Sequence, residues 1–136
     1  MNIQNNYSLD LKNIEPTTTN LEHYRKKQKI KQFLKQSTKE VIFPNADYLA
    51  CEVSVKNSLL ILEHLDDFYD LPKIAVDEDG VIIFVWEKTD KTCLLTFEKD
   101  LLHFYSHNNQ GITLERLDEE RFSKDKFFSE ISPKIF

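Results

Sequence analysis

Residues 73–117 form a run of apolar segments separated by short polar ones, and side chains within the segments follow a period of two. This period is typical of β-strands, in which successive side chains point to opposite faces. Connections of two or three residues join antiparallel neighbours, because parallel strands need a long crossover. We therefore predict an α+β protein with an antiparallel β-meander of four to five strands over 73–117.

The predicted strands are separated by turns that contain the residues such turns require. Gly80 closes the first turn, where a tight hairpin needs a positive φ. The strand after Gly80 is apolar on both faces, which indicates a central position or a cover on each side. The strands are expected at 73–77, 81–88, 92–98, 101–107 and 111–117.

Two helices are predicted before the meander. Thr19 and Glu22 fit a capping box, which indicates that a basic helix occupies 19–40. A long core helix is expected at 45–70, capped by Asn45 and ended by Pro72. Its apolar residues recur at three- and four-residue steps, although the alternation around Cys51 also fits a strand.

The core helix has further apolar side chains beside its main stripe, so most of its circumference is expected to be buried. These additional side chains are Leu49, Val53, Leu60 and Phe68. It should pack on one face of the sheet. The predicted core comprises Leu59, Leu62, Leu65, Ile74, Ile82, Phe84, Trp86, Leu95, Phe97, Leu102 and Phe104.

The ends of the chain are expected to differ. Residues 1–18 are rich in Asn, Gln and Thr and are predicted to form a flexible tail. Residues 19–136 suit one domain. A short C-terminal helix is expected at 123–132, capped by Ser123 and stopped before Pro133.

The sequence predicts a cytoplasmic protein with no membrane contact. No apolar run approaches the roughly 20 residues of a membrane span. The first residues lack the basic and apolar regions of a secretory signal. Two lone thiols, Cys51 and Cys93, are expected to be small apolar side chains and not a disulfide.

Charge is distributed unevenly along the chain. Residues 1–45 carry eight basic and four acidic side chains, a net charge of +4, whereas residues 46–136 carry −9. Such an uneven charge distribution gives information about binding partners and not about the fold. Acidic side chains at the core-helix end and the first turn are predicted to be neighbours that bind a basic protein partner. These are Asp66, Asp67, Asp70, Asp77, Glu78 and Asp79.

The basic helix is open to three interpretations: a solvated face, a contact with a protein partner, or a contact with nucleic acid. Nucleic-acid binding would use the positive side chains to neutralise phosphates. The candidate contacts are Arg25, Lys26, Lys27, Lys29, Lys31 and Lys35.

The fourth predicted strand carries His103, Tyr105 and His107 on one face, with Glu98 just before it. Such a face could hold a metal ion or an acid–base pair. Strand positions four apart are about 13 Å distant, however, which is too far for both histidines to bind one zinc ion. We therefore predict a solvent-facing surface with no metal.

No catalytic motif is found, and no cofactor is predicted. With only Gly80 and Gly111, the chain has no glycine-rich phosphate loop. The turn before Gly80 fails the calcium-loop pattern, because Ala75 and Trp86 occupy two ligand positions. We predict no catalytic residue; the alternative is a small metal-dependent enzyme that uses the His103 and His107 face.

Residues 71–86 contain a Leu-Pro helix end, a strand, an Asp-Gly turn and an apolar strand closing at Trp86. This pattern resembles small, mostly uncharacterised bacterial and phage α+β proteins, with a likeness that covers 45–107. Many of those look like accessory partners in toxin–antitoxin or phage-related gene modules. The resemblance implies a fold more than a function. Such proteins are often immunity- or antitoxin-like, and the resemblance supplies no catalytic residues.

The expected function is therefore a non-catalytic interaction module. It would be an immunity or antitoxin type of inhibitor that binds a basic protein, such as a toxin or nuclease, through its acidic surface. The first alternative is a nucleic-acid-binding accessory protein that uses the basic helix at 21–39.

Overall fold

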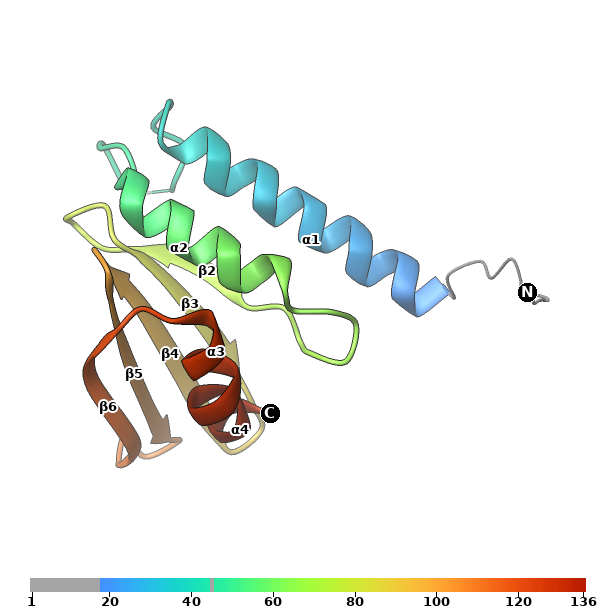
Figure 1. Cartoon of the computed structure of the whole chain (residues 1–136), viewed down its shortest axis with the longest axis vertical. Coiled ribbons are helices and arrows are strands. Elements are labelled where there is room, and N and C mark those ends of the chain that lie inside the picture. The colour runs from blue at the N-terminus through green and yellow to red at the C-terminus, as the bar shows by residue number, and fades with distance from the viewer. Residues whose placement is uncertain (1–17, 45) are drawn as a thin grey trace.

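The computed structural model describes residues 18–44 and 46–136, and their arrangement is an α+β fold in layers (Figure 1). Helix α1 (Thr18–Ser37) lies outside helix α2 (Glu52–Glu63), and α2 packs across one face of a sheet. A short helical segment at the C-terminus lies on the same face as α2 (Figure 1).

The sheet is an antiparallel meander of five strands in the order β2-β3-β4-β5-β6, which confirms the predicted architecture. The last strand runs four residues past its predicted end. Asp118 and Arg121 in this extension are exposed, as an edge strand allows. The strands are β2 (Lys73–Val76), β3 (Ile82–Glu87), β4 (Lys91–Glu98), β5 (Leu101–Asn108) and β6 (Thr113–Arg121).

One face of the sheet forms the core. Along β3, Phe84 and Trp86 are buried, while Ile83 and Val85 on the other face are half-buried. In the part of the chain that the structure describes, the helices cover only the Phe84 face. β3 is thus a strand between two neighbours and not one covered twice.

The core matches the predicted set closely. Nine of its members are buried, and Leu59 and Ile74 pack at its margin as partly buried side chains. The rings of Phe84 and Phe97 meet edge to face with centroids 4.8 Å apart, a favoured aromatic geometry. The nine are Leu62, Leu65, Ile82, Phe84, Trp86, Leu95, Phe97, Leu102 and Phe104.

The predicted core helix, 45–70, is wrong at both ends, because α2 spans only Glu52–Glu63. At its start, Cys51 is extended (φ −72°, ψ 129°), and its N–H donates to the carbonyl of Gly80 at 2.8 Å. This tertiary bond replaces the helical bond that the prediction required. At its end, the N–H of Leu65 bonds three residues back, to Leu62, which tightens the last turn.

Helix α1 already includes Thr18, so the predicted cap at Thr19 is wrong. The remainder of the predicted tail and the predicted cap Asn45 lie outside the described residues. α1 packs through Leu34, which is fully buried, and through Phe33, whose ring meets Phe43 at 4.8 Å.

The C-terminal segment comprises α3 (Lys124–Lys126), a π-helical turn (Phe127–Ile131) and α4 (Ser132–Ile135). Ser123 caps its start by accepting a hydrogen bond from the N–H of Lys126, as predicted. The predicted stop before Pro133 is wrong. Proline crowds the carbonyl four residues before it, and the wider π turn, closed by Ser132 N–H to Phe127, gives the helix room to continue.

Within residues 18–44 and 46–136, no helix combines the length and the apolar character that crossing a membrane requires.

Trp86 should be a major source of stability. Its ring is 2% exposed, and its indole N–H donates to the carbonyl of Asp70 at 2.9 Å. Trp86→Ala should lower the free energy of unfolding by about 3–5 kcal/mol. Urea denaturation followed by circular dichroism measures this. Phe68→Ala, at a ring 90% exposed, is the control and should change little; equal midpoints for both variants would contradict the placement of Trp86.

Gly80 and Gly111 provide a matched pair for the β2–β3 turn. Both have positive φ, 78° and 82°, so alanine at either costs about 1–2 kcal/mol in backbone strain. A Cβ at Gly80 would also lie 2.7 Å from the carbonyl oxygen of Leu49, whereas nothing lies within 4 Å at Gly111. Gly80→Ala should therefore have the lower melting temperature. Equal losses would show that this contact relaxes freely.

Candidate interaction surfaces

The acidic residues predicted to form one cluster are divided between the two ends of α2. The turn that carries Asp77, Glu78 and Asp79 lies at the start of α2, through the bond from Cys51 to Gly80. Asp66 and Asp67 follow its C-terminal end. A helix of 12 residues is about 18 Å long. The single acidic cluster is thus a wrong prediction, because β2 carries the chain back along α2 before the turn.

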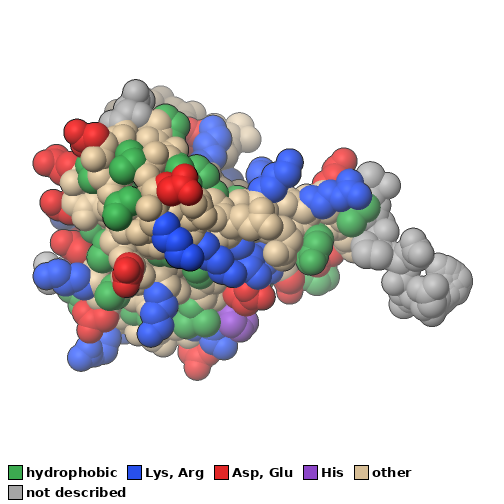
Figure 2. Space-filling view, turned by 90° about the horizontal axis from the view of Figure 1, so that it is seen from above, with side chains coloured by type: hydrophobic (Ala, Val, Ile, Leu, Met, Phe, Trp, Pro, Cys, Tyr) green, Lys and Arg blue, Asp and Glu red, His purple; other side chains and the backbone are tan. Residues whose placement is uncertain are grey.

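One of these groups gains two further carboxylates, and we call the combined group the acidic end. Asp47 and Glu52 join it from the loop before α2 and from the first turn of α2. None of its members forms an ion pair with another described residue, and Figure 2 shows acidic side chains gathered at the left of the molecule. The acidic end comprises Asp47, Glu52, Asp77, Glu78 and Asp79.

The turn in the acidic end is rigid. The carboxylate of Asp77 accepts hydrogen bonds from the N–H groups of Asp79 and Val81, both at 2.9 Å. This Asx turn leaves the side chains of Glu78 and Asp79 exposed. The two carboxylates therefore stand in solvent on a fixed support.

An apolar stripe begins at the acidic end with Leu49, in the loop before α2, and continues along α2 through Val53 to Leu60 near its C-terminal end. Leu49, Val53 and Leu60 are 47%, 46% and 43% exposed, so the predicted burial of these side chains is wrong. Val53 and Leu60 are seven residues apart, two helical turns, and share one side of α2. A shallow hollow of about 280 Å³ at this side is lined by Lys56, Asn57, Leu59, Leu60 and Glu63. Sequence periodicity missed the stripe because exposed and buried leucines have the same spacing.

The other acidic group lies in a loop that presents Phe68. Phe68 is 90% exposed, although the sequence predicted that it would be buried beside the main apolar stripe of the core helix. Asp66 holds the turn, since its carboxylate accepts from Phe68 N–H and its carbonyl from Tyr69 N–H, both at 3.0 Å. His23 Nε2 donates to the carbonyl of Tyr69 at 2.9 Å and ties the loop to α1.

The basic helix is divided as well, because two of its lysines act within the molecule. Lys27 Nζ donates to the carbonyls of Glu63 and Leu65, at 2.8 and 3.0 Å. Lys31 pairs with the Glu63 carboxylate at 2.7 Å. Both cations lie at the negative end of the α2 dipole, where they are favoured. They hold α1 on α2 and are not free for a partner.

These contacts shift the pKa of two groups. Burial lowers the pKa of Lys27, and the nearby Glu63 carboxylate partly opposes it. The hydrogen bond from Lys31 lowers the pKa of Glu63. Because the folded-state pKa of Glu63 is the lower one, its contribution to stability is present above the ordinary pKa of a glutamate and is lost as pH falls through the folded value.

The remaining predicted basic contacts point to solvent. Arg25, Lys26, Lys29 and Lys35 are exposed, and none pairs with a carboxylate of another described residue. Lys39, in the loop after α1, is also exposed and does not pair with a carboxylate of another described residue. Figure 2 shows basic side chains along this helix.

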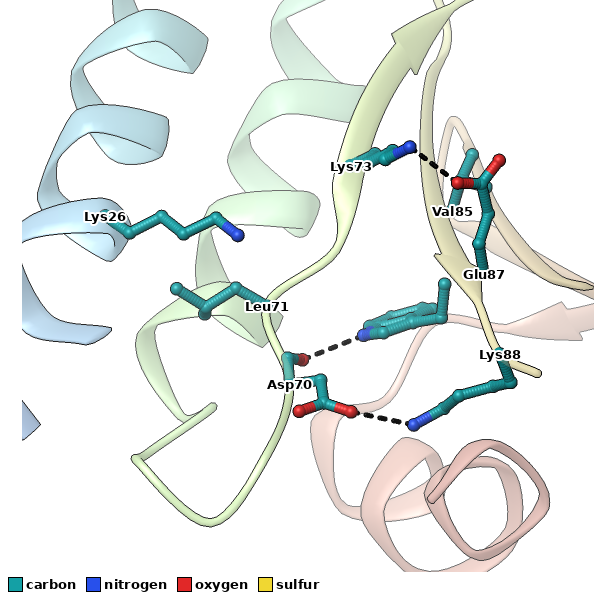
Figure 3. Close-up of a pocket in the computed structure, with 8 residues that line it drawn as sticks. Lys26, Asp70, Leu71, Lys73, Val85, Glu87 and Lys88 are labelled. Carbon is teal, nitrogen blue, oxygen red and sulfur yellow. Dashed lines mark hydrogen bonds and ion pairs between the residues drawn. The ribbon is translucent and has the colours of Figure 1, made fainter. Parts of the chain in front are cut away.

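A cleft of about 300 Å³ lies between α1 and the edge of the sheet (Figure 3). Lys26 points toward it, and the indole of Trp86 forms part of its wall. Its other two lysines are neutralised, Lys88 by Asp70 at 2.8 Å and Lys73 by Glu87 at 2.5 Å. The cleft therefore offers a single unpaired positive charge, that of Lys26.

The predicted His103, Tyr105 and His107 lie on the sheet face away from the helices, and Nε2 of His103 is buried without a hydrogen-bond partner among the described residues. His103 lies 3.3 Å from Glu98, and His107 Nδ1 donates to the carbonyl of Asn108 at 3.1 Å. The Tyr105 hydroxyl accepts from Thr113 at 3.2 Å. Among the described residues, no three His, Cys, Asp or Glu side chains are grouped so that they could hold a metal ion.

No family model, curated protein or solved structure matches this chain. The resemblance to small bacterial and phage α+β proteins therefore stays a prediction, and the geometry alone must indicate the function.

Lys27 and Lys29 provide a test of the α1–α2 contact. Lys27→Met should lower the free energy of unfolding by about 1–2 kcal/mol, because two carbonyls at the end of α2 lose their donor. Lys29→Met removes an exposed, unpaired charge two residues away and should change stability by less than about 0.5 kcal/mol. Urea denaturation of both variants measures the difference, and equal losses would contradict the capping role.

Proposed function

We propose that this chain is a non-catalytic interaction protein of the immunity or antitoxin kind, which binds a basic protein partner through its acidic end and the adjoining apolar stripe. The observation that supports this most is the exposure of Leu49, Val53 and Leu60 beside five carboxylates that have no ion-pair partner among the described residues.

The apolar stripe supplies the affinity in this proposal. Burying a leucine or valine side chain fully is worth about 1.5–3 kcal/mol, so covering three half-exposed ones is worth roughly half as much for each. Exposed apolar patches rimmed by polar residues mark binding sites on protein surfaces. Leu60 also borders the hollow of about 280 Å³, into which an apolar side chain of the partner would fit.

The acidic end supplies the choice of partner. Unneutralised carboxylates attract a positive surface, which speeds association and rejects acidic competitors. A toxin or nuclease that acts on nucleic acid carries lysines and arginines for phosphate contacts. An acidic protein that covers those side chains inhibits it. The proposed setting is the cytoplasm of a bacterium or of a phage-infected cell, in line with the resemblance of residues 71–86.

Charge reversal at the acidic end tests the proposal. In a pull-down from the native host, the full chain should retain a basic protein that the Glu52→Lys, Glu78→Lys, Asp79→Lys triple variant does not. Asp77 is left unchanged because it holds the turn. With the captured protein purified, the association rate should fall at least tenfold in the variant at low salt, as expected for lost electrostatic steering.

The matched control reverses three exposed carboxylates elsewhere, Asp90→Lys, Asp125→Lys and Glu130→Lys. It has the same net charge as the test variant and should capture the partner as the wild type does. Equal capture by the test variant, or a captured partner that is acidic, would rule out the acidic end as the binding surface.

A further inference from the structure

The side of α1 that faces away from α2 carries a set of long polar side chains, which we call the outer row. Arg25 and Lys29 continue into Gln32 and Gln36 at steps of three and four residues, so these four share one side of the helix. Lys35, in the last turn of α1, and Lys39, in the loop after it, are also exposed. From Arg25 to Gln36 the helical part of the outer row spans about 16.5 Å.

The positive charge of the outer row is free for a ligand. Lys27 and Lys31, on the other side of α1, are occupied by the end of α2. Arg25, Lys29 and Lys35 have no carboxylate partner among the described residues. The fold thus divides the basic side chains of α1 into those that bind α2 and those that are unpaired. The sequence of the basic helix does not show this distinction.

We infer that the outer row binds duplex DNA, with its cations on backbone phosphates. This function is separate from the proposed binding of a basic protein. An α-helix fits the major groove, and phosphate contacts by lysine and arginine supply most sequence-independent affinity. Gln32 lies between the cations, where its amide can contact phosphates or base edges. The amide of Gln36 donates to the carboxylate of Glu40.

The composition of the outer row favours DNA over an acidic protein. Protein interfaces depend on apolar or aromatic anchors at their centre, and the outer row contains none. The exposed ring of Tyr24 stands at its side. Protein–DNA interfaces are instead polar and strongly positive, which is the character of this face.

The acidic end is distant from the Arg25 and Lys29 part of the outer row. It is nearer to Lys35 and Lys39, because the carbonyl of Ser37 at the end of α1 accepts a hydrogen bond from the N–H of Ala50 at 2.9 Å. Arg25 and Lys29 flank Lys27, which contacts the C-terminal end of α2, whereas the acidic end lies at the start of α2. That separation of about 18 Å exceeds two Debye lengths at physiological salt. Asp66 and Asp67 are closer, but they face Lys27 on the inner side of α1.

Fluorescence anisotropy of a labelled 20-base-pair duplex of mixed sequence, titrated with the full chain at several salt concentrations, tests the inference. Four phosphate contacts predict a slope of log K against log salt of about −3.6, and the Arg25→Gln, Lys29→Gln variant should halve it to about −1.8. Circular dichroism melting shows whether that variant is folded, and Lys35→Gln with Lys39→Gln provides a second, independent loss of the same size.

The matched control is Lys56→Gln with Lys99→Gln, which removes the same charge from exposed positions outside α1 and should bind as the wild type does. Absence of binding at 50 mM salt, an equal loss in the control, or binding to a single-stranded RNA of the same length but not to the duplex would overturn the inference. None of these results depends on the acidic end, so the proposed protein partner is tested separately.

Discussion

The hydrogen bond from the N–H of Cys51 to the carbonyl of Gly80 is the contact on which the arrangement of this molecule depends. It joins the start of α2 to the turn between β2 and β3, and it is made possible by a glycine whose missing Cβ leaves room for the carbonyl of Leu49. Ser54 adds a second link, since its hydroxyl accepts from the N–H of Ile82 at 2.7 Å. Together these bonds set where α2 begins and how it lies on the sheet.

The surface follows from that placement. Because the β2–β3 turn meets the start of α2, Asp77, Glu78 and Asp79 join Asp47 and Glu52 in the acidic end. Lys27 meets the other end of α2, so that the free cations Arg25 and Lys29 lie away from the acidic end. Lys35 and Lys39 lie nearer to it, because Ser37 is bonded to Ala50. A molecule with separated charges can engage a basic protein and a polyanion at the same time, which links the proposed function to the inferred DNA contact.

Local patterns predicted the parts of the fold that local physics controls. The period of two and the short turns led to the five-stranded meander, and the alternation along β3 placed Phe84 and Trp86 in the core. Ser123 was identified as a cap because its hydroxyl serves an N–H three residues away. The candidate surfaces were predicted only in part. Glu78 and Asp79 are exposed carboxylates, but their expected proximity to Asp66 fails, and Leu60 and Phe68 were expected to be buried beside the main stripe of the core helix.

The sequence by itself determined which segments are strands, which strand residues face the core, and that acidic and basic side chains belong to different segments, because these follow from neighbours a few residues apart. Only the tertiary structure decided where α2 starts and ends, which lysines are free, and which apolar side chains remain in solvent. Those outcomes depend on bonds between residues distant in the chain, such as Cys51 with Gly80 and Lys27 with Glu63, and a periodic pattern contains no information about such partners.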